Sequence, residues 1–262
     1  MDLRSRLKRF AALRACVAVG RTLRDSFGLN VRWLTGVGLW FRFIREFREF
    51  HAIAVRAQSE PPSAGDLIPC LLDRTEVTPI EPVYFVQDTW FAGRVARRRP
   101  ERHVDVGSSA KTMALVAQFI PVTMVDIRPV PIAVEGFTFV KGTILALPYP
   151  DASVPSLSSI CVIEHIGLGR YGDAMDARGT EKAAAELCRV LARGGDLYVS
   201  VPVDDVNRVY FNAHRAFTRE RVLGLFSELE VLDEQYLYGM DVVRNFAKER
   251  GFGTGMFHFR KP

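Results

Sequence analysis

The sequence has few uninterrupted apolar stretches, and we expect neither a membrane-spanning helix nor a signal peptide. From residue 59 onward, the longest stretch without a charged residue covers 112–125 and is interrupted by Pro121. A helix that crosses a bilayer needs about 20 consecutive, mostly apolar residues, so we expect no transmembrane helix. The N-terminus is basic, but Arg14, Arg21 and Arg24 interrupt every apolar run that could form the core of a signal peptide. We therefore do not expect secretion.

Cysteine is also scarce. The chain contains four, with no Cys-x-x-Cys pair and no histidine at metal-ligand spacing from any of them: Cys16, Cys70, Cys161 and Cys188. This pattern excludes a zinc site and a disulfide framework. We expect reduced thiols in a cytoplasmic protein without a bound metal.

The remaining composition is that of a folded protein. Of 262 residues, 48% are hydrophobic and 25% are charged, a balance that supports a sizeable buried core and excludes disorder as the main state. This length predicts one domain with an extension.

Basic and aromatic residues are concentrated at the N-terminus. Residues 1–58 hold 12 Lys or Arg against 4 Asp or Glu, a net charge of +8, whereas the whole chain carries +5. Apolar residues in this part follow one face of a predicted amphipathic helix: Trp33, Val37, Trp40, Phe41, Ile44 and Phe47. A loop-like, proline-containing stretch follows at 58–66, so we predict a helical basic extension over 1–58 and a second domain over 59–262.

The apolar face of this predicted helix has three candidate partners. It could pack within the protein, or on a second copy of the chain in a homodimer, because most amphipathic helices bury their apolar side in protein. It could instead lie on an anionic membrane, where arginine beside tryptophan and phenylalanine is expected. A regular apolar face does not suit a phosphate backbone, so we expect no nucleic-acid partner. We predict peripheral attachment to the cytoplasmic face of the cell membrane.

From residue 103 onward, short apolar runs alternate with helical patterns, which predicts an α/β fold with a doubly wound, mostly parallel sheet. The predicted strands are 103–107, 122–127, 137–142, 157–164, 195–203, 230–238 and 255–260. Helices are predicted over 180–192, from Thr218 onward, and over 241–250, with the last strand returning antiparallel at the sheet edge.

The first strand runs into a turn that can bind a nucleotide-like ligand. Gly107 lets a ligand approach the backbone, Ser108 and Ser109 can cap the next helix, and Asp126 follows at the end of the second strand. ATP or GTP is excluded because the glycines of a phosphate loop are missing. NAD is disfavoured because the second and third glycines of its fingerprint are Ser109 and Thr112. S-adenosylmethionine, which has no phosphate, tolerates a looser turn.

Three further segments carry a family resemblance. The stretches GTILALPYPD (142–151), CVIEHI (161–166) and AELCRVLARGGDLYVSVP (185–202) resemble, in order and spacing, the class I S-adenosylmethionine-dependent methyltransferases. The resemblance covers about 85–260. Within that superfamily, VDVGSS, EHIGLGRYGD and YFNAHR are similar to a methyltransferase-like family whose members often accompany glycan-assembly genes. The resemblance to the superfamily implies a Rossmann-like seven-stranded sheet with strand order 3-2-1-4-5-7-6.

The resemblance also implies a cofactor site for S-adenosylmethionine. Asp105 and Gly107, with Ser108 and Ser109 in the turn, would flank its methionine part, and Asp126, followed by Ile127, would hold the ribose. The adenine would lie along Gly142, Thr143 and Ile144, with Glu164 beside the reacting methyl group. The usual Gly-x-Gly is here Gly107-Ser-Ser109, and Thr143 stands where an aspartate is usual.

The catalytic candidates are Glu164, His165 and His214, and the acceptor-binding candidates are Tyr171, Asp173, Asn212 and His214. A histidine that titrates near neutrality can take a proton from an alcohol. The same residues could instead only cap strands and turns. We expect a methyltransferase that acts on an oxygen of a small-molecule or glycan-type acceptor. The alternatives are a non-catalytic methyltransferase-like binding module and, less favoured, a nicotinamide-dependent oxidoreductase.

Overall fold

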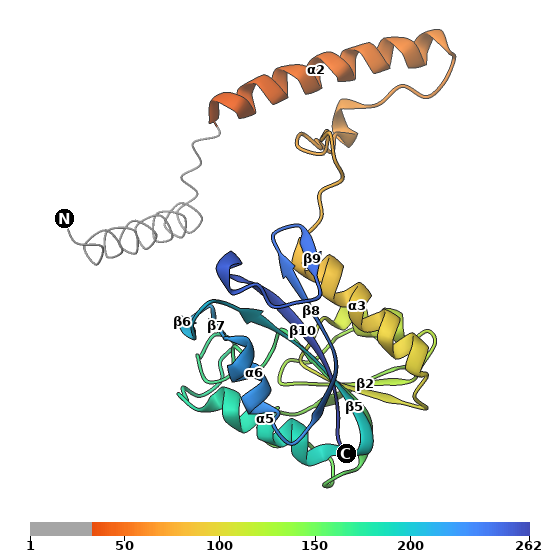
Figure 1. Ribbon diagram of the computed structural model, residues 1–262. Helices are drawn as coiled ribbons and strands as arrows, with labels where there is room; N and C mark the ends of the chain where they lie inside the picture. The colour runs from red at the N-terminus through yellow and green to blue at the C-terminus, as the bar shows by residue number, and fades with distance from the viewer. Residues whose placement is uncertain (1–32) are drawn as a thin grey trace, which may run out of the picture. The chain divides into compact units, whose positions relative to one another are not determined.

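The computed structural model describes residues 33–262 (Figure 1). The chain divides into two units, one up to Pro79 and one from Ile80 onward. The part of the predicted basic extension that precedes residue 33 lies outside the described residues. None of the described helices is long and apolar enough to cross a membrane.

The described part of the first unit is built on one helix, α2 (Trp33–Arg56). A short 3-10 helix, η1 (Ala64–Asp66), follows in an otherwise irregular segment. The predicted boundary at residue 58 comes just after the end of α2, and the compact unit that contains α2 extends to Pro79. The following segment bonds back to the helix: Arg42 Nη2 donates to the Leu71 carbonyl at 3.2 Å, and Arg74 lies 3.5 Å from Glu46.

The second unit contains an eight-stranded sheet with the order β3-β2-β1-β4-β5-β10-β8-β9. Its strands are β1 (His103–Val106), β2 (Val122–Asp126), β3 (Phe137–Lys141), β4 (Val154–Ile160), β5 (Leu191–Val203), β8 (Glu230–Tyr238), β9 (Asp241–Val243) and β10 (Gly253–Arg260). The pairs among β1 to β5 are all parallel, while β10 is antiparallel to β5 and to β8. The predicted α/β, mostly parallel Rossmann-like fold is confirmed, with one strand more than expected.

Two details of the C-terminal part were predicted wrongly. The helix predicted over 241–250 is strand β9 followed by a 3-10 helix, η2 (Lys248–Arg250). Gly239, with a φ of +64°, forms a two-residue turn that folds β9 back along β8, so hairpin geometry outweighs the helical spacing. The last strand is antiparallel as expected, and it lies between β5 and β8, which agrees with the implied order 3-2-1-4-5-7-6 and not with a place at the sheet edge.

Helices cover both faces of the sheet. Buried side chains alternate along β5, where Val199 and Val201 join the cluster that contains α5 (Gly179–Val190) and α6 (Arg219–Leu225). Tyr198, the residue before Val199, joins the cluster of α3 (Pro82–Arg98) and α4 (Ala110–Val116) on the other face. This alternation is the period of two that places successive strand residues on opposite faces. A small hairpin of β6 (Arg208–Tyr210) and β7 (His214–Ala216) follows β5.

Candidate functional site

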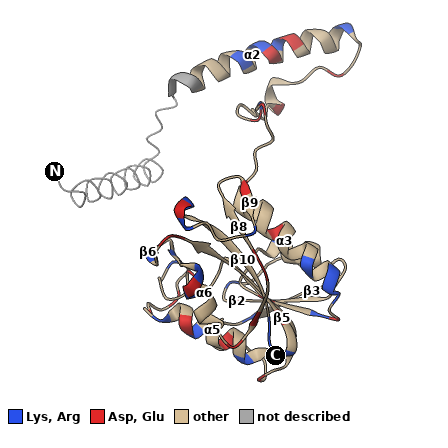
Figure 2. Cartoon of the chain, viewed as in Figure 1, with Lys and Arg blue, Asp and Glu red and all other residues tan. Residues whose placement is uncertain are grey.

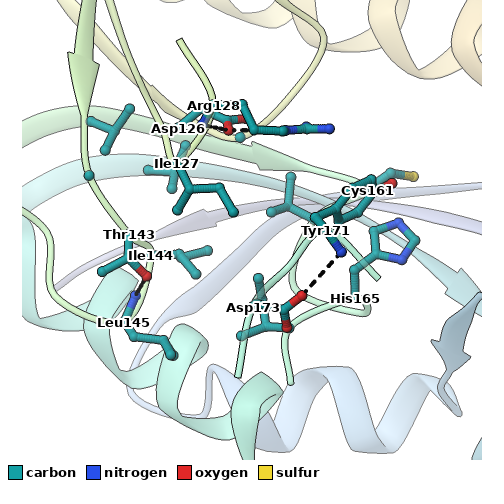
Figure 3. Close-up of a pocket in the computed structure, with 16 residues that line it drawn as sticks. Asp126, Ile127, Arg128, Thr143, Ile144, Leu145, Cys161, His165, Tyr171 and Asp173 are labelled. Atoms are coloured by element: carbon teal, nitrogen blue, oxygen red, sulfur yellow. Dashed lines mark hydrogen bonds and ion pairs between the residues drawn. The ribbon is translucent and has the colours of Figure 1, made fainter. Parts of the chain in front are cut away.

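A pocket opens at the carboxyl edge of the sheet, where β1, β2, β3 and β4 end (Figure 3). It contains about 650 Å³ of space, including the solvent at its mouth. Its lining comes from these four strand ends and from the loop of residues 166–178, called here the 166–178 loop. Doubly wound sheets bind ligands at this edge, at the point where the strand order reverses. The pocket is therefore the candidate site.

Gly107 keeps the floor of this pocket free of a side chain. Its φ is +73°, and a Cβ atom added there would lie 3.0 Å from Val162 Cγ1. Its backbone N–H donates to the Val125 carbonyl at 2.9 Å, which joins the turn to β2. Only glycine adopts this conformation readily and leaves the space above the turn open.

Asp126, the last residue of β2, supplies the carboxylate in this wall of the pocket. Its side chain is 9% exposed, and its Oδ1 accepts bonds from Arg128, at 2.7 Å from the backbone N and 3.4 Å from Nε. Oδ2 lies toward Gly107, 3.9 Å from the position of a Cβ there. The next residue, Ile127, also lines the pocket. One oxygen of Asp126 is thus committed to holding Arg128, and the other faces the turn.

The opposite wall consists of residues 142–145, after β3. A Cβ on Gly142 would lie 2.8 Å from Val125 Cγ1, so the strand ends pack closely here. Ile144 is buried, and Thr143 Oγ1 accepts from the Leu145 backbone N at 3.3 Å. Gly142, Thr143 and Ile144 therefore lie where the resemblance implied, and Leu145 joins them in the lining.

Asp105, in contrast, does not line the pocket but supports the turn from below. It is fully buried, and its carboxylate accepts from the Ser108 backbone N at 3.0 Å and from the hydroxyls of Ser108 and Ser158, each at 2.5 Å. Burial raises the pKa of Asp105 to about 6 despite these bonds. Ser108 Oγ in turn accepts from the Ile160 backbone N at 2.9 Å, so Asp105 and Ser108 bind β1 to β4.

His103 completes this buried network. Because Ser158 donates to Asp105, its oxygen accepts from His103 Nε2 at 2.9 Å, which leaves Nδ1 to accept from the Ser156 hydroxyl at 2.8 Å. Burial lowers the pKa of His103 to about 3, so the ring is neutral. Ser109 lies outside the pocket: its Oγ caps α4 by accepting from Thr112 N at 3.4 Å.

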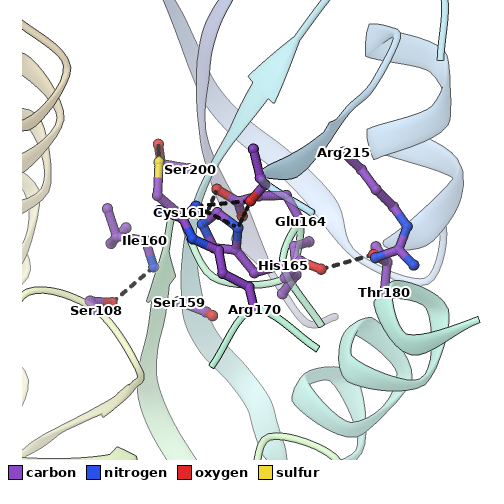
Figure 4. A network of polar contacts seen from close by, with 12 residues as sticks. Ser108, Ser159, Ile160, Cys161, Glu164, His165, Arg170, Thr180, Ser200 and Arg215 are labelled. Carbon is purple, nitrogen blue, oxygen red and sulfur yellow. Dashed lines mark hydrogen bonds and ion pairs between the residues drawn. The ribbon is translucent and has the colours of Figure 1, made fainter. Parts of the chain in front are cut away.

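Glu164 and His165 follow β4 (Figure 4). Glu164 is 1% exposed, does not line the pocket, and its Oε2 has no hydrogen-bond partner among the described residues. Burial raises the pKa of Glu164 to about 8, so the side chain is protonated at neutral pH. His165 lines the pocket, with Nε2 3.7 Å from Glu164 Oε1.

The hydrogen bonding of His165 determines which nitrogen can take a proton. Nδ1 lies 2.7 Å from the Ala213 carbonyl, which can only accept, so Nδ1 carries the hydrogen and Nε2 holds the lone pair. Burial lowers the pKa of His165 to about 4. His165 is therefore a neutral ring in a fixed orientation at physiological pH.

The 166–178 loop forms the remaining wall. Tyr171 and Asp173 both line the pocket. Asp173 acts inside the loop, because its Oδ2 accepts from the Gly167 backbone N at 2.7 Å and its Oδ1 from Tyr171 N at 3.3 Å. Burial acts to raise the pKa of Asp173, but these backbone bonds outweigh it and the pKa is lowered. The structure thus gives Asp173 a loop-stabilising position.

The turn between β6 and β7 brings Asn212 and His214 near this wall without placing either in the pocket lining. Asn212 is exposed, and the His214 ring lies 6.4 Å from that of His165. Burial lowers the pKa of His214, and the charge of Arg170 lowers it further. The link to the pocket is the Ala213 carbonyl between them, which accepts from His165.

Three residues that the sequence analysis did not single out are important to the site. Arg128 and Arg170 contact Tyr171, with Cζ 4.5 Å and 5.0 Å from its ring centroid. Arg215, inside the YFNAHR motif, is 9% exposed and donates to the Ile166 carbonyl at 2.7 Å, which anchors the 166–178 loop. Arg170 and Arg215 each lie inside a quoted motif, EHIGLGRYGD and YFNAHR, which was the available signal for both, whereas the sequence gave no signal for Arg128.

Replacing Glu164 by glutamine should change how stability depends on pH. Between pH 4.5 and about 8 the folded state keeps a proton on Glu164 that the unfolded state has lost, so stability of the wild type falls as pH rises through this window. Glutamine does not titrate. From pH 5 to 8, the free energy of unfolding of Glu164→Gln should therefore rise relative to that of the wild type, by up to about 1.4 kcal/mol per pH unit. The melting temperature of the variant should rise relative to that of the wild type over the same range.

Thermal unfolding of the full chain at several pH values measures this difference. The matched control is Glu135→Gln, which changes an exposed carboxylate and should stay parallel to the wild type. Parallel curves for Glu164→Gln and the wild type would contradict the raised pKa, whatever the constant offset between them.

The comparisons with known proteins concern two overlapping segments. Residues 104–199 match a family model described as "Methyltransferase domain". Residues 152–248, which include the 166–178 loop, Asn212 and His214, match a model described as "Caenorhabditis protein of unknown function, DUF268". No curated protein matches the chain in sequence.

Solved structures share the fold. The N-methyltransferase NodS from Bradyrhizobium japonicum WM9 is 16% identical, with a TM-score of 0.51 over 73% of this chain and 99% of that one. The 1,6-didemethyltoxoflavin-N1-methyltransferase from Burkholderia thailandensis is 17% identical, with a TM-score of 0.49 over 71% of this chain and 93% of that one. At this identity the likeness to NodS concerns the fold alone.

Proposed function

Residues 104–199 are a methyltransferase domain of the class I S-adenosylmethionine-dependent superfamily, and on this premise we propose that the protein methylates an oxygen of a small-molecule or glycan-type acceptor. The observation that carries the proposal is the pocket at the carboxyl ends of β1 to β4, where the Asp126 carboxylate lies beside the bare turn at Gly107. The glycan-type acceptor is proposed from the resemblance of the VDVGSS, EHIGLGRYGD and YFNAHR motifs.

The residues present fit S-adenosylmethionine. The turn at Gly107 carries no side chain, Asp126 Oδ2 can accept from a ribose diol, and the buried Ile144 offers an apolar surface to an adenine ring. Asp105 and Ser108 would act indirectly, by holding the turn in shape. When bound, the cofactor supplies an electrophilic methyl group on a sulfonium.

The chain's own contribution is to orient the acceptor and to accept its proton. We assign the proton to His165 or His214, since both are neutral at pH 7 and lie beside the 166–178 loop. In this proposal Glu164 acts next to His165 as a neutral, buried carboxyl group. Tyr171 and Asn212 are the proposed acceptor contacts, and Asp173 supports Tyr171 through the loop.

Calorimetry with S-adenosylmethionine, S-adenosylhomocysteine and NAD tests the function. We expect saturable binding of the first two and none of NAD. Binding of NAD alone would favour an oxidoreductase. Methyl transfer is measured in a separate assay with hydroxyl and amine acceptors. Binding of S-adenosylmethionine without transfer to either kind of acceptor would favour a non-catalytic module. Transfer to amines alone would replace oxygen by nitrogen as the methylated atom.

We also propose that the protein attaches peripherally to an anionic membrane through α2. Large apolar side chains are exposed on this helix, with Trp40 at 47% and Phe41 at 72%, and arginines share its surface (Figure 2). Each basic residue near an anionic surface adds about 1 kcal/mol of binding free energy. Such attachment would suit a lipid-linked glycan acceptor.

Sedimentation of the full chain with liposomes measures this attachment. Binding to anionic vesicles should exceed binding to neutral ones, should weaken at high salt, and should fall several-fold in Phe41→Asp. The control is Phe252→Asp, which changes a half-exposed phenylalanine of the second unit and should bind as the wild type does. Absence of binding to anionic vesicles would contradict the proposal, and a Phe41-dependent dimer would assign α2 to a second copy.

A further inference from the structure

Two arginines meet one tyrosine at the mouth of the pocket. Arg128 follows β2 and Arg170 belongs to the 166–178 loop, yet their Cζ atoms lie 4.5 Å and 5.0 Å from the centroid of the Tyr171 ring. Arg128 and Tyr171 both line the pocket (Figure 3), and the His165 ring lies 5.5 Å from Tyr171. Both guanidinium groups therefore contact the same aromatic ring.

Most of the hydrogen-bond donors of these two arginines are unused. Among the described residues, the Arg128 side chain donates through Nε alone, to Asp126 at 3.4 Å, and it is 59% exposed. Arg170 donates through Nη1 to the Ala213 carbonyl at 2.8 Å and forms no ion pair among the described residues; Nη1 also lies 3.4 Å from His165 Nδ1, which carries a hydrogen and cannot accept from it. Each guanidinium has five N–H donors, so both have free ones for a ligand.

Only one of the two arginines has an acidic partner among the described residues: Arg128 Nε lies 3.4 Å from Asp126 Oδ1. Asp126 Oδ1 is shared with the Arg128 backbone, and Asp173 is used by backbone N–H groups of its own loop. Glu164 is buried and protonated at neutral pH. The Arg170 guanidinium therefore lies beside Tyr171 without an ion-pair partner among the described residues, next to the two histidines proposed to accept the proton.

We propose that Arg128 and Arg170 bind an oxyanion, a carboxylate or a phosphate, of the acceptor, and that the acceptor is therefore anionic. The paired N–H groups of a guanidinium match the spacing of two oxygens in a planar carboxylate or a tetrahedral phosphate. The Tyr171 ring contacts both guanidinium groups and helps to hold them in position. This inference rests on the proposed function in assigning the anion to the acceptor. The competing source of the same chemistry is the cofactor's own carboxylate.

Titration of the full chain with sodium phosphate and with sodium acetate, at constant ionic strength in sodium chloride, tests the site. Binding is followed by calorimetry and by ³¹P line broadening, without and with saturating S-adenosylhomocysteine. We expect at least one of the two anions to bind saturably in both conditions, and the stronger one identifies phosphate or carboxylate chemistry. Arg170→Gln and Arg128→Gln should each weaken that binding about tenfold.

Two variants serve as controls. Arg178→Gln changes an exposed arginine at the end of the same loop and should bind the anion as the wild type does. Arg170→Lys keeps the positive charge but loses the paired N–H donors of the guanidinium, so its anion affinity should lie between those of the wild type and Arg170→Gln. S-adenosylhomocysteine affinity should stay unchanged in Arg170→Gln, which also shows that the variant is folded.

Three outcomes would overturn the proposal. The first is no saturable binding of either anion, and the second is an equal loss in Arg178→Gln. The third is displacement of the anion by S-adenosylhomocysteine together with weaker S-adenosylhomocysteine binding in Arg170→Gln, which would assign the arginines to the cofactor's carboxylate. Anion binding that depends on Arg170, in a chain that binds no S-adenosylhomocysteine, would keep the anion site and refute the methyltransferase function separately.

Discussion

Replacing His165 and His214 together by alanine should lower the rate of methyl transfer to a hydroxyl acceptor by a factor of about 10² to 10⁴. An alcohol becomes a good nucleophile only as its proton leaves, and a positioned general base contributes about this factor. The Ala213 carbonyl holds Nδ1 of His165 at 2.7 Å, which directs the lone pair to Nε2, and His214 follows one residue later. The single variants should show which ring acts as the base.

The pH dependence tests whether a histidine with a lowered pKa is the base. A base must be unprotonated, so the rate falls as pH drops through its pKa. If His165 is the base, activity should persist until pH approaches about 4, because burial lowers its pKa to that value. Burial also lowers the pKa of His214 from the usual 6.5. With either histidine as the base, the rate should therefore begin to fall only below pH 6.5.

Transfer of a labelled methyl group from S-adenosylmethionine measures these rates. His165→Gln can still hydrogen-bond but takes no proton, so it separates positioning from base catalysis. His51→Ala, on an exposed residue of α2, is the matched control. If both single alanine variants and the double variant turn over like the wild type, histidine is not the base, and an acceptor that needs none, such as an amine or thiol, replaces the alcohol.

The second large effect is expected at Asp126. A hydrogen bond to a charged group contributes about 1.5–3 kcal/mol, so Asp126→Ala should weaken binding of S-adenosylmethionine and S-adenosylhomocysteine about ten- to a hundredfold. The carboxylate is 9% exposed, with Oδ1 committed to Arg128 and Oδ2 toward Gly107. Its loss therefore removes both the ligand contact and the support of the strand end.

Calorimetry with two further variants separates these contributions. Asp126→Asn keeps an acceptor oxygen for the Arg128 backbone but has no charge, so affinity should fall less than in the alanine variant. Asp241→Ala removes an exposed aspartate paired with Arg250 and should leave affinity unchanged. Wild-type affinity in Asp126→Ala would refute the assignment of this residue to the ribose.

The strands and the first turn could be predicted from the sequence because their signals are local. Apolar runs at strand length, glycine after β1 and threonine before α6 each act within a few residues, and Thr218 Oγ1 does accept from Arg221 N at 3.2 Å. The 241–250 segment shows the limit of such signals. Its spacing is helical, but pairing with β8 decides its structure.

The site was only partly predictable for the same reason. Gly107, Asp126 and 142–144 were expected to face the ligand because parallel strands end at one edge, and all line the pocket. Asp105 was placed beside the ligand, but alternation along β1 and the hydroxyl of Ser158, 53 residues away, bury it beneath the turn. Strand periodicity could indicate that Asp105 is buried but could not identify its partner.

By itself, the sequence determined the fold class, the strand ends that form the pocket and the amphipathic character of α2, because these depend on composition, short-range spacing and a recognisable order of motifs. Only the tertiary structure decided that Arg128 contacts Tyr171, 43 residues later in the chain, and that the Ala213 carbonyl orients His165 from 48 residues away. Such contacts join segments whose approach is set by loop closure and packing. Periodic patterns in the sequence therefore cannot predict which distant residues meet at the edge of the folded sheet.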